Sequence, residues 1–361
     1  MPFHLMIKLT VPIVFFGYAV FANVMLLNED IGSVEFDQFL NGGVTEEVDE
    51  LYRSNLPHQE AAVGLIGAAR YLVLNEGRSG VVVGLDGWLF SSEEFRDQSQ
   101  ALAVLPETLQ WITEVQSELN AKGAELVIVP IPAKIEIAQD YLSDASQAEQ
   151  IVEVYDAFLE GSGDAGLKVV DTRSALFDVA PAFFSTDTHW TIQGAEAVAE
   201  AVSASGFIPL GDETFAEVPQ AAVTFSGDLV SFVTTEDLAP AIGLGTEQIV
   251  PVTADGNLPD NDLEGGLDLF GTSTPIPVAL VGTSYSANTD WSFAELLKIA
   301  LSQDVLNYAK EGQGPVIPMQ DYLADLTVDD VPAVVIWEFP IRYLTDPDLM
   351  PGFDVEGDDN A

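Results

Sequence analysis

The sequence predicts an α/β fold in which a mostly parallel sheet is flanked by helices on both faces. Two observations predict this class. Segments whose apolar residues recur at helical spacing alternate along the chain with short apolar runs typical of buried strands. No low-complexity linker divides the 361 residues, and a chain of this length can bury one large core. We therefore expect one main domain.

The alternation begins with a helix and a strand around residue 123. From Pro106 to Lys122 apolar residues share one helical face, and Gly123 follows as a typical residue after a helix end. Glu125 to Pro132 (ELVIVPIP) is then predicted as a buried strand. The same order recurs, with helices around 151–158, 192–202 and 293–301 and strands at Leu167 to Asp171 and Ala333 to Trp337.

One predicted strand ends in a serine. The stretch from Pro277 to Ser286 reads PVALVGTSYS, an apolar run that stops at a turn of Gly282, Thr283 and Ser284. A serine placed where a parallel strand breaks into a loop lies at the rim of the sheet, the usual position of a nucleophile or ligand contact. The turn also offers the backbone N–H of Ser284 to an oxyanion.

Upstream, Asp187 and His189 are candidates for the partners of that serine. In an extended stretch residues two apart project to the same side, so Asp187 can hold one ring nitrogen while the other faces Ser284. A serine hydroxyl is a poor nucleophile until a base removes its proton, and a carboxylate stabilises the imidazolium that forms. A simple loop hydrogen bond between Asp187 and His189 is the structural alternative, and both interpretations stay open from the residues alone.

Several segments fall outside the alternation. Residues 61–346 are predicted as the main domain, within which 206–276 form a β-rich insertion of short runs and turns. The acidic loop from Ala254 to Asp268 lacks the ligand spacing of an EF-hand, which favours a solvated loop over a calcium site. Residues 29–60 are predicted as a stalk and 347–361 as an acidic tail.

The N-terminal residues 1–28 are predicted as a signal anchor or a cleaved signal peptide. Leu9 to Leu27 carries no charge and is long enough, at roughly 1.5 Å per residue, to cross a hydrocarbon core of roughly 30 Å. The apolar run continues beyond the small residue Ala22, which favours an anchor. Lys8 precedes the run and acidic residues follow it, so the positive-inside rule places the domain outside the cytoplasm.

Composition excludes several kinds of function. The formal net charge of −46 repels polyanions and disfavours nucleic acid as a partner. The chain has no cysteine and three histidines, so neither disulfides nor a thiolate site can form and a zinc site is not expected. We expect neither a metal nor a cofactor.

Five blocks of sequence resemble the alginate O-acetyltransferase AlgJ/AlgX family, from about Leu51 to Leu344. They are, in order, Gly84 to Phe90 with Glu93 to Phe95, Val129 to Lys134, Asp187 to Trp190, Gly282 to Ser286, and Trp337 to Tyr343. The resemblance implies an SGNH-hydrolase-like domain with circularly permuted motif order, in which Asp-x-His precedes the serine. The chain stops soon after the last block, so its architecture looks more like AlgJ than AlgX. Ile341 stands where an acidic residue is expected.

The resemblance also implies roles. Ser284 matches the nucleophile, His189 the base and Asp187 its orienting acid. Members of the family act in the bacterial periplasm, where they move acetyl groups onto exopolysaccharide hydroxyls together with a membrane-bound O-acyltransferase. For this chain we therefore expect a periplasmic location at the inner membrane, a polysaccharide acceptor and such an acyltransferase as the acetyl supplier.

Four further residues are candidates for substrate binding. Lys134, Arg342 and Tyr343 follow strand-like runs, which places them near the rim that carries the serine. Trp190 lies next to the predicted base and is either a sugar contact or a core residue.

Two of these residues have a structural alternative. Arg342 has a carboxylate four residues earlier, Glu338, with which it can form a buried ion pair, and Lys134 can form a surface pair with Glu136.

Three functions remain open from the sequence. The first is acetyl transfer through an acetyl-Ser284 intermediate to a polysaccharide hydroxyl. The second is hydrolysis of the same intermediate by water, which makes the protein a carbohydrate acetyl esterase. The third is a non-catalytic scaffold of an export complex, which a long distance between Ser284 and His189 would favour. Because the chain is so acidic, the acceptor is either alginate or a less anionic polymer.

Overall fold

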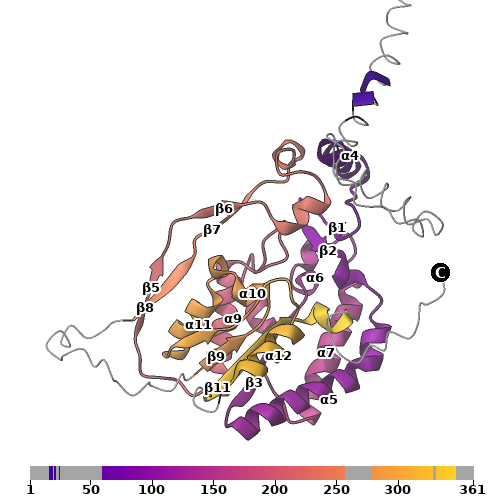
Figure 1. The fold of residues 1–361 in the computed structure, drawn as a ribbon. Helices are drawn as coiled ribbons and strands as arrows, with labels where there is room; N and C mark the ends of the chain where they lie inside the picture. Colours follow the sequence, from indigo (N-terminus) through magenta and orange to yellow (C-terminus); the bar gives the residue numbers. More distant parts are fainter. Residues whose placement is uncertain are drawn as a thin grey trace, which may run out of the picture.

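The computed structural model describes residues 59–256, 278–327 and 331–346, together with isolated residues between 16 and 24. Its centre is a five-stranded sheet in the order β10-β9-β11-β3-β4, and every pair in it is parallel (Figure 1). The strands are β3 (Glu125–Ile131), β4 (Lys168–Val169), β9 (Val278–Val281), β10 (Val305–Asn307) and β11 (Val334–Pro340). The predicted parallel α/β sheet is confirmed.

Helices cover both faces of this sheet, because alternate residues of each buried strand point to opposite sides. On one face, Ala279 and Val281 pack with α5 (Ser99–Lys122), α7 (Glu149–Asp164) and α12 (Val316–Asp325). On the other, Val278 and Leu280 pack with α9 (Ile192–Ala204) and α11 (Phe293–Leu301). The strand β9 is thus buried on both sides.

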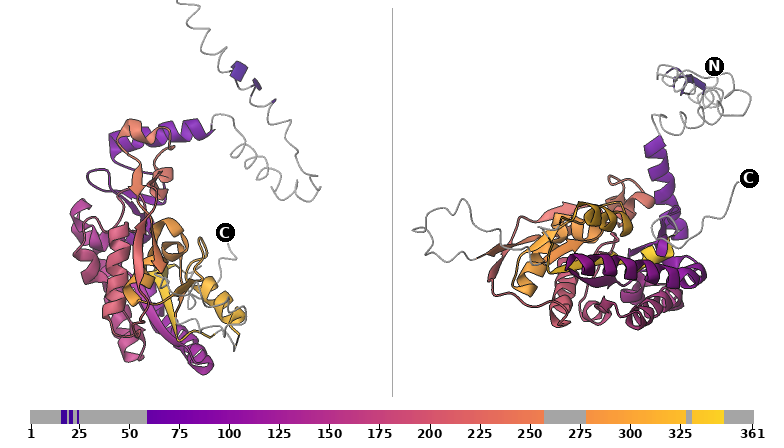
Figure 2. Two further views of the ribbon diagram at one scale, coloured as in Figure 1. Left: turned by 90° about the vertical axis from the view of Figure 1, so that its left-hand side faces the viewer. Right: turned by 60° about the horizontal axis from the view of Figure 1, so that its bottom comes forward.

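The remaining elements lie around this core. Figure 2 shows α4 at one edge of the molecule, where Thr234 Oγ1 donates to the carbonyl of Gly64 over 2.9 Å. Two antiparallel pairs, β5–β8 and β6–β7, lie between α9 and β9 in sequence. The bounds of the other elements are α4 Gln59–Leu74, β1 Val81–Val83, β2 Leu89–Ser91, η1 Ser92–Phe95, α6 Lys134–Ile137, η2 Gln139–Tyr141, η3 Ala145–Ala148, α8 Arg173–Phe177, β5 Phe215–Pro219, β6 Val223–Phe225, η4 Asp228–Phe232, η5 Ala239–Ile242, β7 Glu247–Ile249, β8 Val252–Gly256, α10 Ser284–Ala287, η7 Thr289–Trp291 and η8 Ile341–Thr345.

Several boundaries differ from those predicted. The helix predicted from Pro106 begins seven residues earlier, at Ser99, whose N–H donates to Oδ1 of Asp97 over 3.0 Å. Pro106 therefore lies inside α5. The last strand continues to Pro340, beyond the predicted end at Trp337. The prediction ended there because the next residue, Glu338, is charged, but its side chain is buried within the strand.

Other predicted segments lie outside the described residues. No helix in the described ranges is long and apolar enough to cross a membrane. The predicted leader (1–28) and stalk (29–60) lie outside those ranges, apart from the isolated residues and the first two residues of α4. The tail (347–361) and the acidic loop from residue 257 onward also lie outside them.

Candidate active site

Ser284 lies three residues after the end of β9, at the first position of the short helix α10. The side chain of Thr283 accepts a hydrogen bond from the N–H of Tyr285 over 3.5 Å and so caps this helix. The predicted serine at a strand end is therefore present, at the carboxyl edge of the sheet where α/β proteins place their sites.

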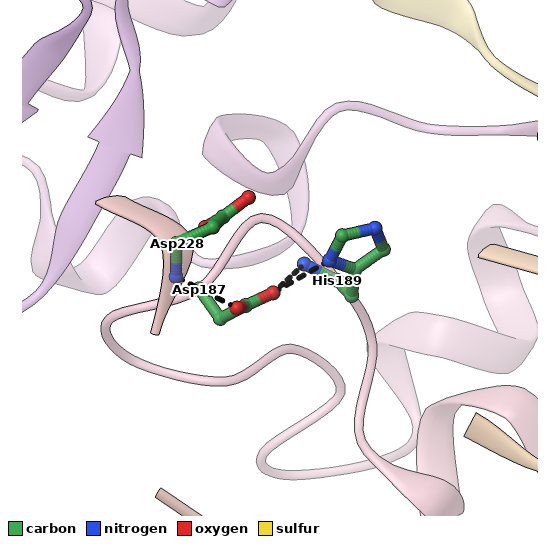
Figure 3. A group of neighbouring side chains, drawn as sticks. All are labelled: Asp187, His189 and Asp228. Atoms are coloured by element: carbon green, nitrogen blue, oxygen red, sulfur yellow. Dashed lines mark hydrogen bonds and ion pairs between the residues drawn. The ribbon is translucent and has the colours of Figure 1, made fainter. Parts of the chain in front are cut away.

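Asp187 and His189 lie in a bent loop rather than in the extended stretch that the sequence predicted. The bend comes from the Asp187 carboxylate, whose Oδ1 accepts hydrogen bonds from the backbone N–H of His189 (2.8 Å) and from its ring Nδ1 (2.6 Å). The other oxygen, Oδ2, accepts the N–H of Asp228 over 2.9 Å (Figure 3). Three donors thus hold one carboxylate.

The imidazole of His189 joins this loop to the serine. Its Nε2 lies 2.8 Å from Ser284 Oγ, so the predicted approach of the ring to both Asp187 and Ser284 is confirmed. With Nδ1–H donating to the carboxylate, Nε2 is left free to accept the serine proton. Trp291 stacks on the imidazole with ring centroids 5.1 Å apart, and Tyr285 contacts it at 4.7 Å.

Two carboxylates beside the histidine have opposite pKa shifts. Burial acts to raise the pKa of Asp187, but the hydrogen bonds and charge of His189 and the N–H of Asp228 outweigh it and lower that pKa. Burial and the neighbouring charge of Asp187 raise the pKa of Asp228. Asp187 is therefore the ionised partner of His189, and Asp228 is a second carboxylic acid that the sequence did not indicate.

Asp187, His189 and Asp228 are also the one group found in the described residues whose ligand atoms lie close enough, within 4.8 Å, to hold a metal ion (Figure 3). Both oxygens of Asp187 already accept N–H groups, and Asp228 accepts Thr188 N–H and Oγ1–H over 2.9 and 2.6 Å. The hydrogen bonding accounts for the cluster.

A protein-family model described as "SGNH hydrolase-like domain, acetyltransferase AlgX" matches residues 81–341. The chain belongs to this family. A relative in Pseudomonas aeruginosa, "Probable alginate O-acetylase AlgJ", is 36% identical over 328 residues, which are 88% of this chain and 84% of that protein. The alginate biosynthesis protein AlgX of Azotobacter vinelandii is 30% identical over 71% of this chain and 53% of its own length.

Solved structures agree with the AlgJ/AlgX assignment. The O-acetyltransferase domain of Pseudomonas putida AlgJ superposes with a TM-score of 0.64 at 33% identity, covering 74% of this chain and 93% of that domain. Pseudomonas aeruginosa AlgX superposes with a TM-score of 0.57 at 25% identity, covering 74% and 64%. The predicted resemblance is confirmed, and the chain is an O-acetyltransferase of the AlgJ/AlgX family.

Lys134 is buried, which does not fit the expectation that it binds substrate. Its Nζ donates to the carbonyl oxygens of Leu89 (2.6 Å), Ser185 (3.1 Å) and Asp187 (2.9 Å), and the side chain is 1% exposed. The alternative surface pair with Glu136 is also wrong, because Lys134 points into the protein. Its contacts hold the loop that carries Asp187 and His189.

Trp190 is likewise inaccessible to a sugar. Its side chain is fully buried and packs against Tyr285 at 5.1 Å and Phe293 at 4.7 Å between ring centroids. The core alternative for Trp190 is therefore correct. Its neighbour along the chain, His189, contacts the same tyrosine ring at 4.7 Å between centroids.

Arg342 and Tyr343 lie at the end of β11 but differ in exposure. The guanidinium of Arg342 is buried and donates to Tyr285 Oη (3.1 Å) and to Glu93 Oε2 (3.2 Å). The predicted ion pair with Glu338 is wrong, because Glu338 points toward the serine turn instead. Tyr343 is partly exposed, and its ring centroid lies 5.0 Å from the Arg342 guanidinium. Of the four predicted substrate residues, Tyr343 remains the accessible one.

Proposed function

We propose that the protein transfers acetyl groups through an acetyl-Ser284 intermediate to hydroxyl groups of an exopolysaccharide. The observation that carries the proposal is the continuous hydrogen-bonded series from Asp187 through His189 to Ser284, with distances of 2.6 and 2.8 Å. In a family of acetyltransferases, this arrangement gives the hydroxyl the base that it needs to attack a carbonyl.

The first half of the reaction acetylates the serine. Ser284 Oγ attacks the carbonyl carbon of the acetyl donor while its proton moves to Nε2 of His189, and the imidazolium is stabilised by Asp187. The departing group takes that proton, the donor's acyl bond breaks, and acetyl-Ser284 remains. The backbone N–H of Ser284 begins a helix, where it has no helical acceptor, and is placed to donate to the oxyanion.

The second half regenerates the enzyme. A hydroxyl of the acceptor gives its proton to Nε2 of His189 as its oxygen attacks the acetyl carbonyl. The bond between the acyl carbon and Ser284 Oγ then breaks, and the serine recovers the proton from the imidazolium. Attack by water in place of the sugar hydroxyl would make the protein an esterase. A scaffold without catalysis would not need the 2.8 Å contact between His189 and Ser284.

The relatives and the sequence support proposals for the acceptor and the location. Relatives named as alginate O-acetylases support alginate as the acceptor, whereas the formal charge of −46 favours a less anionic polymer at low salt. We place the domain in the periplasm, held at the inner membrane by residues 1–28, where a membrane-bound O-acyltransferase supplies acetyl groups.

Product analysis separates the transferase from the esterase. The protein is given an activated acetyl ester with and without oligomers of alginate or of a neutral polysaccharide, and mass spectrometry compares acetylated sugar with free acetate. A transferase yields acetylated oligosaccharide at the expense of acetate, because the acceptor intercepts the acyl-enzyme. Acetate alone in every mixture, formed by the wild type and not by Ser284→Ala, would assign the protein as an esterase.

A further inference from the structure

Glu338 is a fully buried carboxylate beside the turn that carries the nucleophile. It belongs to β11, which pairs with β9, and its side chain is 0% exposed. In the described part of the chain no cation pairs with it, since the nearby Arg342 donates to Glu93 and Tyr285. A buried anion without a countercharge is destabilising unless hydrogen bonds compensate for its lost hydration.

All of the donors to this carboxylate come from the serine turn. Glu338 Oε2 accepts the N–H of Thr283 over 3.0 Å and the hydroxyl of Ser286 over 2.7 Å, and Oε1 accepts the hydroxyl of Thr283 over 3.0 Å. Thr283 comes one residue before Ser284 and Ser286 two residues after it. The carboxylate therefore fixes the backbone on both sides of the nucleophile.

Gly282 allows this close approach. A Cβ at position 282 would lie 2.5 Å from Glu338 Oε2 and 3.1 Å from the Glu338 carbonyl oxygen. Burial raises the pKa of Glu338, while the hydrogen bonds from Ser286 and Thr283 and the charge of His189 oppose that shift. The hydrogen-bond donors around the Glu338 carboxylate thus belong to the turn that carries Ser284.

We propose that Glu338 is a positioning residue for acyl transfer. It holds the turn so that Ser284 Oγ remains within hydrogen-bond distance of Nε2 of His189. The inference rests on the proposed function, because it concerns how the same serine is aimed. A negative charge on Glu338 also favours the imidazolium that forms when His189 takes the serine proton, because in the described part of the chain no cation pairs with this carboxylate. Loss of the carboxylate thus affects the chemical step more than the binding of the acetyl donor.

Glu338→Gln tests the proposal with little change of shape. The hydroxyls of Thr283 and Ser286 can accept as well as donate, so the glutamine amide can be hydrogen-bonded and the fold kept. We expect kcat for an activated acetyl ester to fall by about 100-fold with KM unchanged, because the amide is uncharged and has one acceptor oxygen in place of two, and a shift of the nucleophile by roughly 1 Å is enough for such a loss. Melting temperatures are recorded in parallel.

A matched pair at Thr283 provides the control. Thr283→Val keeps the shape but removes the hydroxyl that bonds Glu338, whereas Thr283→Ser keeps the hydroxyl. We expect kcat to fall in the valine variant and to be largely preserved in the serine variant. If Glu338→Gln does not fold, the comparison of the two Thr283 variants tests the proposal instead. Equal kcat in folded Thr283→Val and Thr283→Ser would overturn it.

The failure of this inference and that of the proposed function give different results. Wild-type protein that forms no acetyl adduct on Ser284 contradicts the proposed function itself. Wild-type protein that forms the adduct, together with a folded Glu338→Gln variant that forms it at the same rate, contradicts only the role of Glu338.

Discussion

The buried Lys134 holds the loop that carries Asp187 and His189. Its Nζ has three backbone carbonyl acceptors, those of Leu89, Ser185 and Asp187. A charged ammonium group has three protons and satisfies all of them, whereas a neutral amine has only two. Deprotonation of Lys134 therefore leaves one carbonyl without a donor and loosens the loop that carries Asp187.

This chemistry predicts an alkaline loss of activity. Burial lowers the pKa of Lys134 to about 8, against the opposing charges of Glu94, Asp187, Asp228 and Glu247. Turnover of a small acetyl ester should therefore decline above about pH 8. The free energy of unfolding should not decline over the same pH range. A lysine whose pKa is lower in the folded than in the unfolded protein contributes more to stability as pH rises from about 8 toward its ordinary 10.5. A pH–rate profile and melting temperatures measured together check both.

Two variants isolate the contribution of this lysine. Lys134→Met should be less active and should lack the alkaline decline near pH 8. Lys168→Met is the control, because Lys168 is exposed and pairs with Glu125 at the surface, and it should keep the wild-type profile. An unchanged alkaline decline in Lys134→Met would show that another group titrates.

The site was partly predictable from the sequence at this scale. Ser284, His189 and Asp187 were found because two short motifs carry them. Asp228 and Glu338 were not, because their partners are 41 and 55 residues away and only the fold brings them together. Lys134 became a candidate for substrate binding because it follows a strand-like run, and Trp190 because it adjoins the predicted base, but neither position says anything about the direction of a side chain.

At the level of elements, η4 packs directly against the loop that carries the base. Its first residue, Asp228, donates its N–H to Asp187 and accepts from Thr188. The preceding residue, Gly227, is so close that a Cβ there would lie 2.2 Å from the carbonyl oxygen of Thr186. The contact between η4 and the loop therefore requires glycine at this position.

Gly227→Ala tests this contact. The added methyl group should push η4 away from the loop, destabilise the protein by about 1–3 kcal/mol and lower esterase activity. Gly163→Ala is the control, since nothing lies within 4 Å of a Cβ at that position near the end of α7, and it should be neutral or slightly stabilising. Urea unfolding and ester turnover are the measurements. Wild-type stability and activity in Gly227→Ala would show that η4 does not support the loop.

The sequence predicted long elements better than short ones. The strands β3 and β9 and the helices α7, α9 and α11 were found because their apolar patterns are continuous. The strands β1, β2 and β10 have three residues each, too few for a periodic pattern, and were missed. The start of α5 was misplaced because proline, common in the first turn of a helix, lies inside this one.

At the level of the whole molecule, the N-terminal segment should affect delivery of acetyl groups rather than chemistry. A version that starts near Asn28 should be soluble and should hydrolyse small acetyl esters at the wild-type rate, because the described site uses no residue before Leu89. In cells the exported soluble version should acetylate polymer poorly unless it is anchored again, since tethering raises the local concentration at a membrane-bound acetyl supplier. Equal polymer acetylation by both versions would show that the anchor is dispensable.

The central claim is that Ser284 carries the acetyl group. Intact-protein mass spectrometry after brief mixing with an activated acetyl ester tests it most directly, with peptide mapping to locate the modification. We expect one acetyl group on Ser284 in the wild type, a greatly slowed reaction in Asp187→Asn and no adduct in a folded Ser284→Ala variant. An acetyl adduct that forms equally fast in Ser284→Ala, or that maps to another residue, would contradict the account.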